Sequence, residues 1–170
     1  MIKILFVCWG NICRSPMAEF VFKKMVADEG FSHTFTIASA ATSSEEIGND
    51  IYPPAKAEMK KQGIPFTRRS ARQIRPEDFE TYDLVIGMDS TNARSLNRTA
   101  GNKKDSRGIP YASKIHSMMS FAGKSKDVAD PWYTRDFHRT YCDIVEGCRG
   151  LLETCKEMRE FEWSRRNDKE

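Results

Sequence analysis

The residues best suited to chemistry lie near the start of the chain, in the stretch VCWGNICRSP at positions 7–16. Cys8 ends an apolar run, and Arg14 follows six residues later, directly before Ser15 and Pro16. A thiolate is a strong nucleophile, and a guanidinium is a two-pronged donor that matches phosphate or arsenate oxygens. The spacing therefore predicts a thiol that attacks a bound oxyanion.

The expected surroundings of Cys8 favour the thiolate over the thiol. A tight loop between a strand and a helix can turn its backbone N–H groups inward, and the helix start adds positive potential. Asn11 suits such a loop because asparagine tolerates a positive φ. Ser15 can donate its hydroxyl to the sulfur and stabilise it as a leaving group. The alternative is an inert buried cysteine beside a surface arginine, but the agreement of these local features favours a nucleophile.

A reaction of this kind also needs a general acid, because the leaving oxygen must be protonated and a water must then be deprotonated. The best candidate is Asp130, in the stretch DVADPWYTRDF, where Pro131 holds it in an extended conformation. Trp132 and Tyr133 can wall a slot for an aromatic ring. Since Asp-Pro is also a common turn signal, a turn with two packing aromatics is an equal alternative from the local sequence alone.

Repeating apolar patterns predict the elements that position these residues. The predicted strands share an extended apolar pattern and cover 2–7, 34–40, 82–88 and, more weakly, 113–119. The predicted helices begin at Pro16, Pro53, Ser90 and Asp136, and we expect Ser15 and Asp89 to cap two of them. Strands that alternate with helices indicate an α/β fold with a parallel sheet. Such sheets place their sites at the carboxyl ends of the strands, where Cys8 lies.

The length and composition of the chain limit the kinds of protein it can be. We expect one domain over residues 1–160 and a charged C-terminal tail over 161–170 that frays. The net charge of +3 is too small to indicate nucleic-acid binding. The N-terminal apolar run is too short to cross a membrane and lacks the features of a secretory signal. The five cysteines are an odd number, which fits a reducing compartment, so we expect a cytoplasmic protein. We also expect a monomer without membrane contact.

Taken together, the separated motifs resemble those of the low-molecular-weight protein tyrosine phosphatases. The matching segments are CWGNICRSP at 8–16, Ser39-Ala40, SARQI at 70–74, DFETYDLVIGMD at 78–89 and DPWY at 130–133. The resemblance covers about residues 1–155. It implies a four-stranded parallel sheet flanked by helices on both faces, with a phosphate-binding loop after the first strand. It also implies hydrolysis of phosphotyrosine in proteins, and of small aryl phosphates, without metal or cofactor.

The resemblance further implies a role for each site residue. Cys8 forms a phosphocysteine, Arg14 holds the phosphoryl group, and Asp130 acts first as acid and then as base. The residues that bind phosphate or support the loop are Trp9, Gly10, Asn11, Ile12, Cys13, Ser15 and Ser39. Trp132 and Tyr133 flank the phosphotyrosine ring. Cys13 matches a second loop cysteine that can form a reversible disulfide with the nucleophile and so protect it from overoxidation. An apolar filler beneath the loop is the alternative for Cys13.

Two positions depart from the family pattern. Glu45 stands where many relatives carry an aromatic residue, so one wall of the substrate slot is acidic or open. Arg69 stands where a histidine usually supports Asn11, so the loop must be supported differently. Arg68, Arg69 and Arg72 form either a basic rim that attracts phosphopeptides or an ordinary solvated face.

Other activities on the same fold remain alternatives. Arsenate reductases relay electrons through two further cysteines in a mobile segment, whereas Cys142, Cys148 and Cys155 all fall on the predicted last helix. Phosphoarginine phosphatases tend to carry threonine at the position of Ile12, so Ile12 together with Trp132 favours an aromatic substrate.

A phosphate-binding module without catalysis is a third alternative. Such a module needs the loop and Arg14, but neither Cys8 nor Asp130. The cysteines and the few histidines show no zinc spacing, so we expect no metal.

Overall fold

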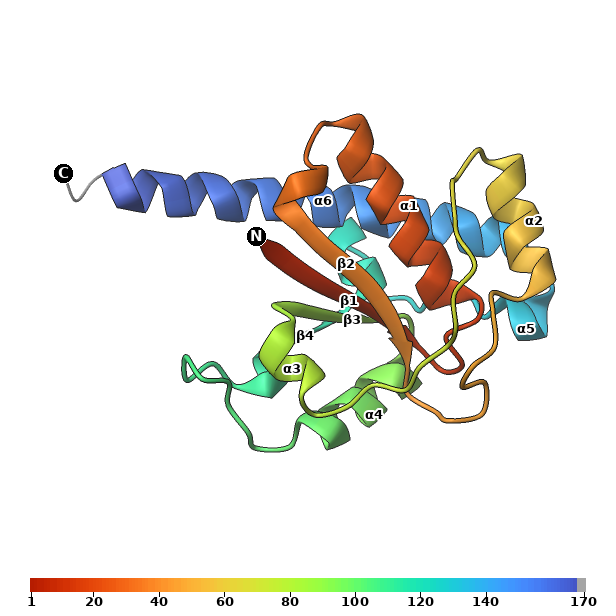
Figure 1. The fold of residues 1–170 in the computed structure, drawn as a ribbon, viewed down its shortest axis with the longest axis horizontal. Coiled ribbons are helices and arrows are strands. Elements are labelled where there is room, and N and C mark those ends of the chain that lie inside the picture. Colours follow the sequence, from red (N-terminus) through yellow and green to blue (C-terminus); the bar gives the residue numbers. More distant parts are fainter. Residues whose placement is uncertain (168–170) are drawn as a thin grey trace.

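The computed structural model describes the backbone of residues 1–167 and the side chains of residues 1–160. Its centre is a four-stranded sheet in the order β2-β1-β3-β4, and every neighbouring pair of strands is parallel (Figure 1). The strands are β1 (Ile2–Cys8), β2 (Phe35–Ala41), β3 (Leu84–Gly87) and β4 (Ile115–Ser117). The predicted α/β fold with a parallel sheet is confirmed.

Helices cover both faces of the sheet, as expected. The α-helices are α1 (Arg14–Asp28), α2 (Pro53–Lys61), α3 (Asp78–Thr81), α4 (Ser90–Ala100), α5 (Pro131–Thr134) and α6 (Phe137–Asn167). Three 3₁₀ turns cover Ser32–Thr34, Tyr111–Lys114 and Met118–Ala122. In Figure 1, α1 and α6 lie together on one side of the sheet, and α3 and α4 lie on the other.

The side chains of β1 explain why its apolar pattern is continuous. Ile4 and Phe6 point into the core that the sheet forms with α1 and α6, whereas Leu5 and Val7 point into the core with α3 and α4. All four are fully buried. Because successive side chains of a strand point to opposite faces, a central strand that is covered on both faces must be apolar at every position.

The first helix starts earlier than the sequence predicted. Its N-cap is Cys13 and its first residue is Arg14, so the predicted capping role of Ser15 is wrong. The physical reason is that the loop before α1 turns the Ser15 hydroxyl toward the sulfur of Cys8, at 3.1 Å. By contrast, Asp89 caps α4 as predicted, with its carboxylate accepting a hydrogen bond from the backbone N–H of Asn92 at 2.7 Å.

The remaining predicted elements are present with shifted ends. β4 covers only three residues of the predicted 113–119 and pairs with β3 alone, because it lies at the edge of the sheet. The backbone of 161–167, assigned by sequence to the charged tail, continues α6. Residues 168–170 of that tail lie outside the described part of the chain, and the division into 1–160 and 161–170 stays a prediction. No helix in the described residues has the length and apolar character needed to span a membrane.

Candidate active site

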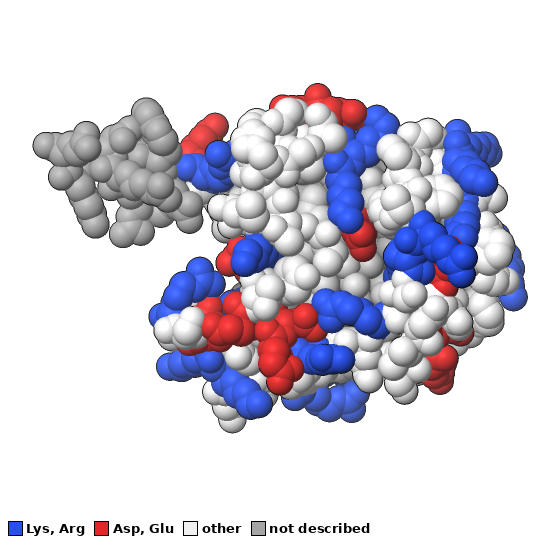
Figure 2. Space-filling view, in the orientation of Figure 1, with Lys and Arg blue, Asp and Glu red and all other residues white. Residues whose placement is uncertain are grey.

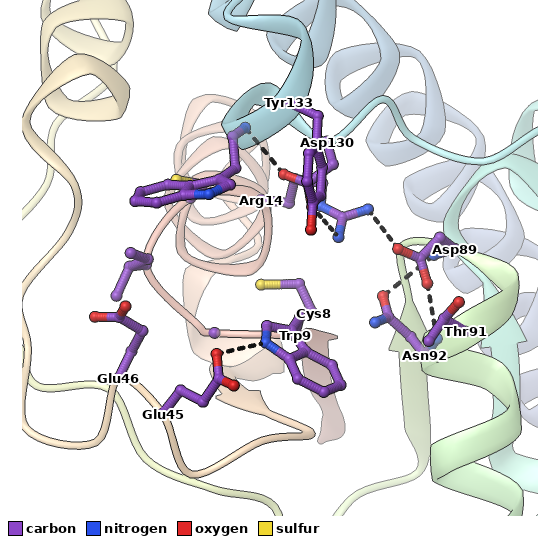
Figure 3. Close-up of a pocket in the computed structure, with 14 residues that line it drawn as sticks. Cys8, Trp9, Arg14, Glu45, Glu46, Asp89, Thr91, Asn92, Asp130 and Tyr133 are labelled. Atoms are coloured by element: carbon purple, nitrogen blue, oxygen red, sulfur yellow. Dashed lines mark hydrogen bonds and ion pairs between the residues drawn. The ribbon is translucent and has the colours of Figure 1, made fainter.

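A cavity of about 430 Å³ opens at the carboxyl ends of β1 and β3 (Figure 3). Its walls come from the loop after β1, the loop after β2 and the starts of α4 and α5. The lining residues are Cys8, Trp9, Gly10, Ile12, Cys13, Arg14, Glu45, Glu46, Asp89, Thr91, Asn92, Asp130, Trp132 and Tyr133. The structure thus brings ten of the thirteen sequence-predicted site residues into one cavity. The other three, Asn11, Ser15 and Ser39, lie behind the loop and support it.

The sulfur of Cys8 lies at the base of this cavity, at the end of β1, with only 3% of the residue exposed. It accepts a hydrogen bond from the backbone N–H of Asn11 at 3.3 Å and lies 3.1 Å from the Ser15 hydroxyl. In Figure 3 the sulfur points into the open space below Asp130. Cys8 therefore has two hydrogen-bond partners and also faces the open cavity.

Asn11 holds the loop in shape. It is 1% exposed and has a φ of 58°, a left-handed conformation that side chains rarely adopt. Its side-chain nitrogen donates to the hydroxyls of Ser15 at 2.8 Å and Ser39 at 2.9 Å. Its side-chain oxygen accepts from the backbone N–H of Arg72 at 3.3 Å. A strained residue persists when its surroundings determine it so completely, and such residues cluster at functional sites.

Arg69, at the position where a histidine usually supports Asn11, supports Asn11 here through the backbone carbonyl. Its guanidinium donates to the backbone carbonyl of Asn11 and, at 3.2 Å, to that of Asn49. Burial lowers the pKa of Arg69, as expected for a cation partly removed from water. Arg72 forms two 3.0 Å hydrogen bonds with the carboxylate of Asp78. Two of the three arginines predicted as a basic rim thus make structural contacts. Figure 2 shows basic groups interspersed with acidic groups on the face it views, with several basic groups gathered on its right side.

Arg14 is buried, at 2% exposed, and surrounded by acceptors. Its guanidinium donates to Asp89 at 2.9 Å, to the carbonyl of Val128 at 3.1 Å and to Asp130 at 3.3 Å. Burial acts to lower the pKa of Arg14, but the neighbouring Cys8, Asp130 and Asp89 together outweigh burial and raise that pKa. Arg14 therefore keeps a fixed charge at the base of the cavity.

Asp89 is a site residue that sequence reasoning missed. From its sequence position Asp89 is predicted only as a helix cap, and one carboxylate oxygen has that role. The other oxygen pairs with Arg14. A usable signal was its position directly after β3, because the carboxyl ends of β1 and β3 meet at the same edge of the sheet. Glu19 was missed as well, although it accepts a hydrogen bond from the Ser39 hydroxyl at 2.7 Å.

Asp130 is both a turn residue and a carboxylate of the cavity, the two alternatives that the local sequence left open. It caps the short helix α5, with one oxygen accepting from the backbone N–H of Trp132 at 3.0 Å. Its other oxygen faces Arg14, and 29% of its side chain remains exposed. The Asp-Pro turn is therefore real, and it aims a carboxylate into the cavity.

Aromatic side chains form the mouth of the cavity. Trp9 is 45% exposed, Trp132 46% and Tyr133 83%. Glu45, the position that departs from the family pattern, lies beside Trp9 and accepts a hydrogen bond from its indole N–H at 3.1 Å (Figure 3). Exposed aromatic residues around a cavity are typical of a ligand-binding surface.

The remaining cysteines have contrasting environments. Cys13 is 6% exposed and lines the cavity, and burial, together with the nearby Cys8 and Asp130, raises its pKa to about 12. Cys148 and Cys155 are fully buried, which raises the pKa of both thiols and fits the core role predicted for them. Cys142 is exposed on α6.

The sequence of this chain matches one family of known proteins over nearly its whole length. The family model described as "Low molecular weight phosphotyrosine protein phosphatase" matches residues 3–161. A human protein of that same name is 42% identical over 154 residues, which cover 89% of this chain and 94% of the relative. The Bacillus subtilis low molecular weight protein-tyrosine-phosphatase YfkJ is 35% identical over 163 residues, covering 95% of this chain and 100% of that protein.

Solved structures agree with these sequence matches. The crystal structure of YfkJ has a TM-score of 0.85 at 35% identity and covers 93% of this chain and 96% of its own. The Drosophila arginine phosphatase has a TM-score of 0.82 at 28% identity, with 91% and 98% covered.

The network around Asn11 generates a prediction about ligand binding. Asn11→Gly keeps the positive φ accessible but removes three side-chain hydrogen bonds. We expect the affinity for inorganic phosphate, measured by calorimetry, to fall about tenfold, which corresponds to about 1.4 kcal/mol. Asn11→Ala should lose a further ~1–2 kcal/mol of unfolding free energy, because alanine is strained in the left-handed region.

Asn102→Gly, at an exposed position on the surface, is the matched control and should bind phosphate as the wild type does. Wild-type phosphate affinity in Asn11→Gly would contradict the supporting role of this network.

Proposed function

Because the chain belongs to the low molecular weight phosphotyrosine protein phosphatase family, we propose that it is a hydrolase that removes phosphate from phosphotyrosine in proteins. The observation that carries this proposal is the meeting of Cys8, Arg14 and Asp130 in one cavity, although Arg14 and Asp130 are 116 residues apart in sequence. Together they provide a nucleophile, a fixed positive charge and an acid, which are the three groups that the reaction needs.

In the first step, the sulfur of Cys8 attacks the phosphorus atom. A sulfur–phosphorus bond forms as the bond to the tyrosyl oxygen breaks, and Asp130 gives its proton to the leaving oxygen. Arg14 binds the phosphoryl oxygens. Its contact with Asp130, at 3.3 Å, is longer than its 2.9 Å contact with Asp89, which supports a model in which the phosphoryl group displaces Asp130 and releases it to act as the acid.

In the second step, a water molecule attacks the phosphocysteine. Asp130 now accepts a proton from this water, the sulfur–phosphorus bond breaks, and phosphate leaves. The departing thiolate of Cys8 is stabilised by the backbone N–H of Asn11 and by the hydroxyl of Ser15, which lie 3.3 and 3.1 Å from the sulfur. Asp89 keeps Arg14 in place throughout, because it holds a different guanidinium nitrogen from the one that faces Asp130.

The shape of the cavity mouth supports an aromatic substrate. Trp132 and Tyr133 line the cavity together with Asp130. In Figure 3, Trp9 and Asp130 lie on opposite sides of the Cys8 sulfur. A tyrosyl ring between such walls gains contact area and stacking energy, of about 0.5–1.5 kcal/mol for each aromatic pair. Ile12, which also lines the cavity, offers no hydroxyl for a guanidinium phosphate.

We expect a clear preference for phosphotyrosine over phosphoarginine, of at least tenfold in kcat/KM. The measurement is phosphate release from two peptides that differ only in the phosphorylated residue. Cys8→Ser is the control for the nucleophile and should abolish turnover. A preference for the phosphoarginine peptide would replace the proposed substrate, and full activity of Cys8→Ser would refute the mechanism.

Asp130→Ala should lower kcat by roughly 10²–10⁴, the usual contribution of general acid catalysis. The loss should shrink as the pKa of the leaving phenol decreases, since a better leaving group needs less protonation. A series of aryl phosphates measures this dependence. An equal loss for every leaving group would exclude Asp130 as the acid.

We also propose that Cys13 protects the nucleophile from overoxidation. The five free cysteines suggest that the protein works in a reducing compartment such as the cytoplasm. Peroxide converts the Cys8 thiolate to a sulfenic acid, and the Cys13 thiol then displaces water to form a disulfide. Cys8 and Cys13 line the same cavity, which supports this pairing.

After treatment with peroxide, the wild type should therefore regain activity with a dithiol, whereas Cys13→Ser should regain at least fivefold less. Cys142→Ser removes an exposed cysteine outside the cavity and should recover like the wild type. Equal recovery of Cys13→Ser would indicate that Cys13 is only an apolar filler.

A further inference from the structure

Trp132 is held from two sides by residues that do not line the cavity. The ring of Tyr52 lies against the indole with 5.2 Å between centroids and an angle of 53°. The guanidinium of Arg135 lies over the indole, 5.3 Å from its centroid. Arg135 also donates a hydrogen bond to the Tyr52 hydroxyl at 3.3 Å, which joins the two supports. We call Tyr52 and Arg135 the indole clamp.

The clamp joins parts of the chain that are far apart. Arg135 and Trp132 belong to the segment around α5, whereas Tyr52 directly precedes α2, 83 residues before Arg135. Tyr52 also packs on Phe137, the first residue of α6, with 6.1 Å between the ring centroids. The position of the exposed indole is therefore fixed by tertiary contacts and not only by its own short helix.

The backbone of Arg135 is strained. Its φ is 58°, and Asn11 is the only other residue in the described chain that has a positive φ and is not glycine. Glycine adopts this conformation without a steric penalty, and arginine does not. Strained residues of this kind concentrate at functional sites, where another interaction offsets the strain. The contacts that the Arg135 side chain makes are those of the indole clamp.

We propose that Arg135 is a positioning residue that, with Tyr52, fixes Trp132 as a rigid wall and so selects ring-bearing phosphate esters. A half-exposed indole without partners would move among several rotamers, and a ligand would have to restrict that motion on binding. A cation over the face of the indole and a tilted aromatic neighbour both favour one orientation. The selection of a ring deepens the proposed phosphotyrosine phosphatase function and rests on it.

Arg135→Gly tests the proposal because it removes the clamp and relieves the backbone strain together. We expect a thermal midpoint equal to or above that of the wild type. The KM for a phosphotyrosine peptide should rise about fivefold, with a smaller change in kcat. The inhibition constant of inorganic phosphate should change less than this KM, since phosphate has no ring to contact Trp132.

Two further variants separate positioning from a general structural or charge effect. Tyr52→Phe keeps the ring but loses the hydroxyl that accepts from Arg135, so it should raise KM by a smaller factor than Arg135→Gly. The double variant should be no worse than Arg135→Gly alone, because both changes break the same clamp. Arg98→Ala removes one positive charge from the exposed end of α4 and should leave KM unchanged.

Benzylphosphonate, which carries a ring and is not hydrolysed, separates this proposal from the proposed function. Calorimetry should show that Arg135→Gly weakens benzylphosphonate binding several-fold more than binding of inorganic phosphate. Equal effects on both ligands, or a wild-type KM for the peptide in Arg135→Gly, would overturn the clamp. Absence of phosphotyrosine hydrolysis by the wild type would instead overturn the proposed function, and the benzylphosphonate comparison would still decide the role of Arg135.

Discussion

The left-handed backbone of Asn11 is the constraint on which the site depends. This one residue turns the chain after β1 so that a backbone N–H meets the sulfur of Cys8. Its side chain fixes Ser15 and Ser39, and Arg69 supports its carbonyl from behind. The strain is tolerated because each polar group of the side chain has a partner in a buried position, where an unpaired group would be costly.

At the base of the cavity, one positive side chain, Arg14, faces two carboxylates, those of Asp89 and Asp130. Arg14 is buried among acceptors, and its two terminal nitrogens face different carboxylates. Asp89 also caps α4, so it is held in place by a second role. Asp130 caps a short helix and its side chain is more exposed than that of Asp89, which supports the proposal that an incoming phosphoryl group replaces it. Two carboxylates near one guanidinium thus have different surroundings, on which the different roles proposed for them rest.

Local sequence was sufficient for much of the fold. The continuous apolar run of β1 predicts a strand buried on both faces, and Asp89 is recognisable as a cap, because both depend on interactions within a few residues or on one repeating pattern. The predicted Ser15 cap was wrong because the hydroxyl has a tertiary alternative, the sulfur of Cys8. β4 was predicted too long because an edge strand ends where its only neighbour ends, and that neighbour is distant in sequence.

The sequence by itself determined the types and spacing of Cys8, Arg14 and Asp130, and with them the expected chemistry. The tertiary structure decided which groups those residues meet. It placed Asp89 beside Arg14, put Arg69 behind Asn11 and brought Tyr52 onto Trp132. The physical reason is that the spacing of residues within one loop is written in the chain. Partners 58 to 83 residues apart are set only when the sheet and helices pack.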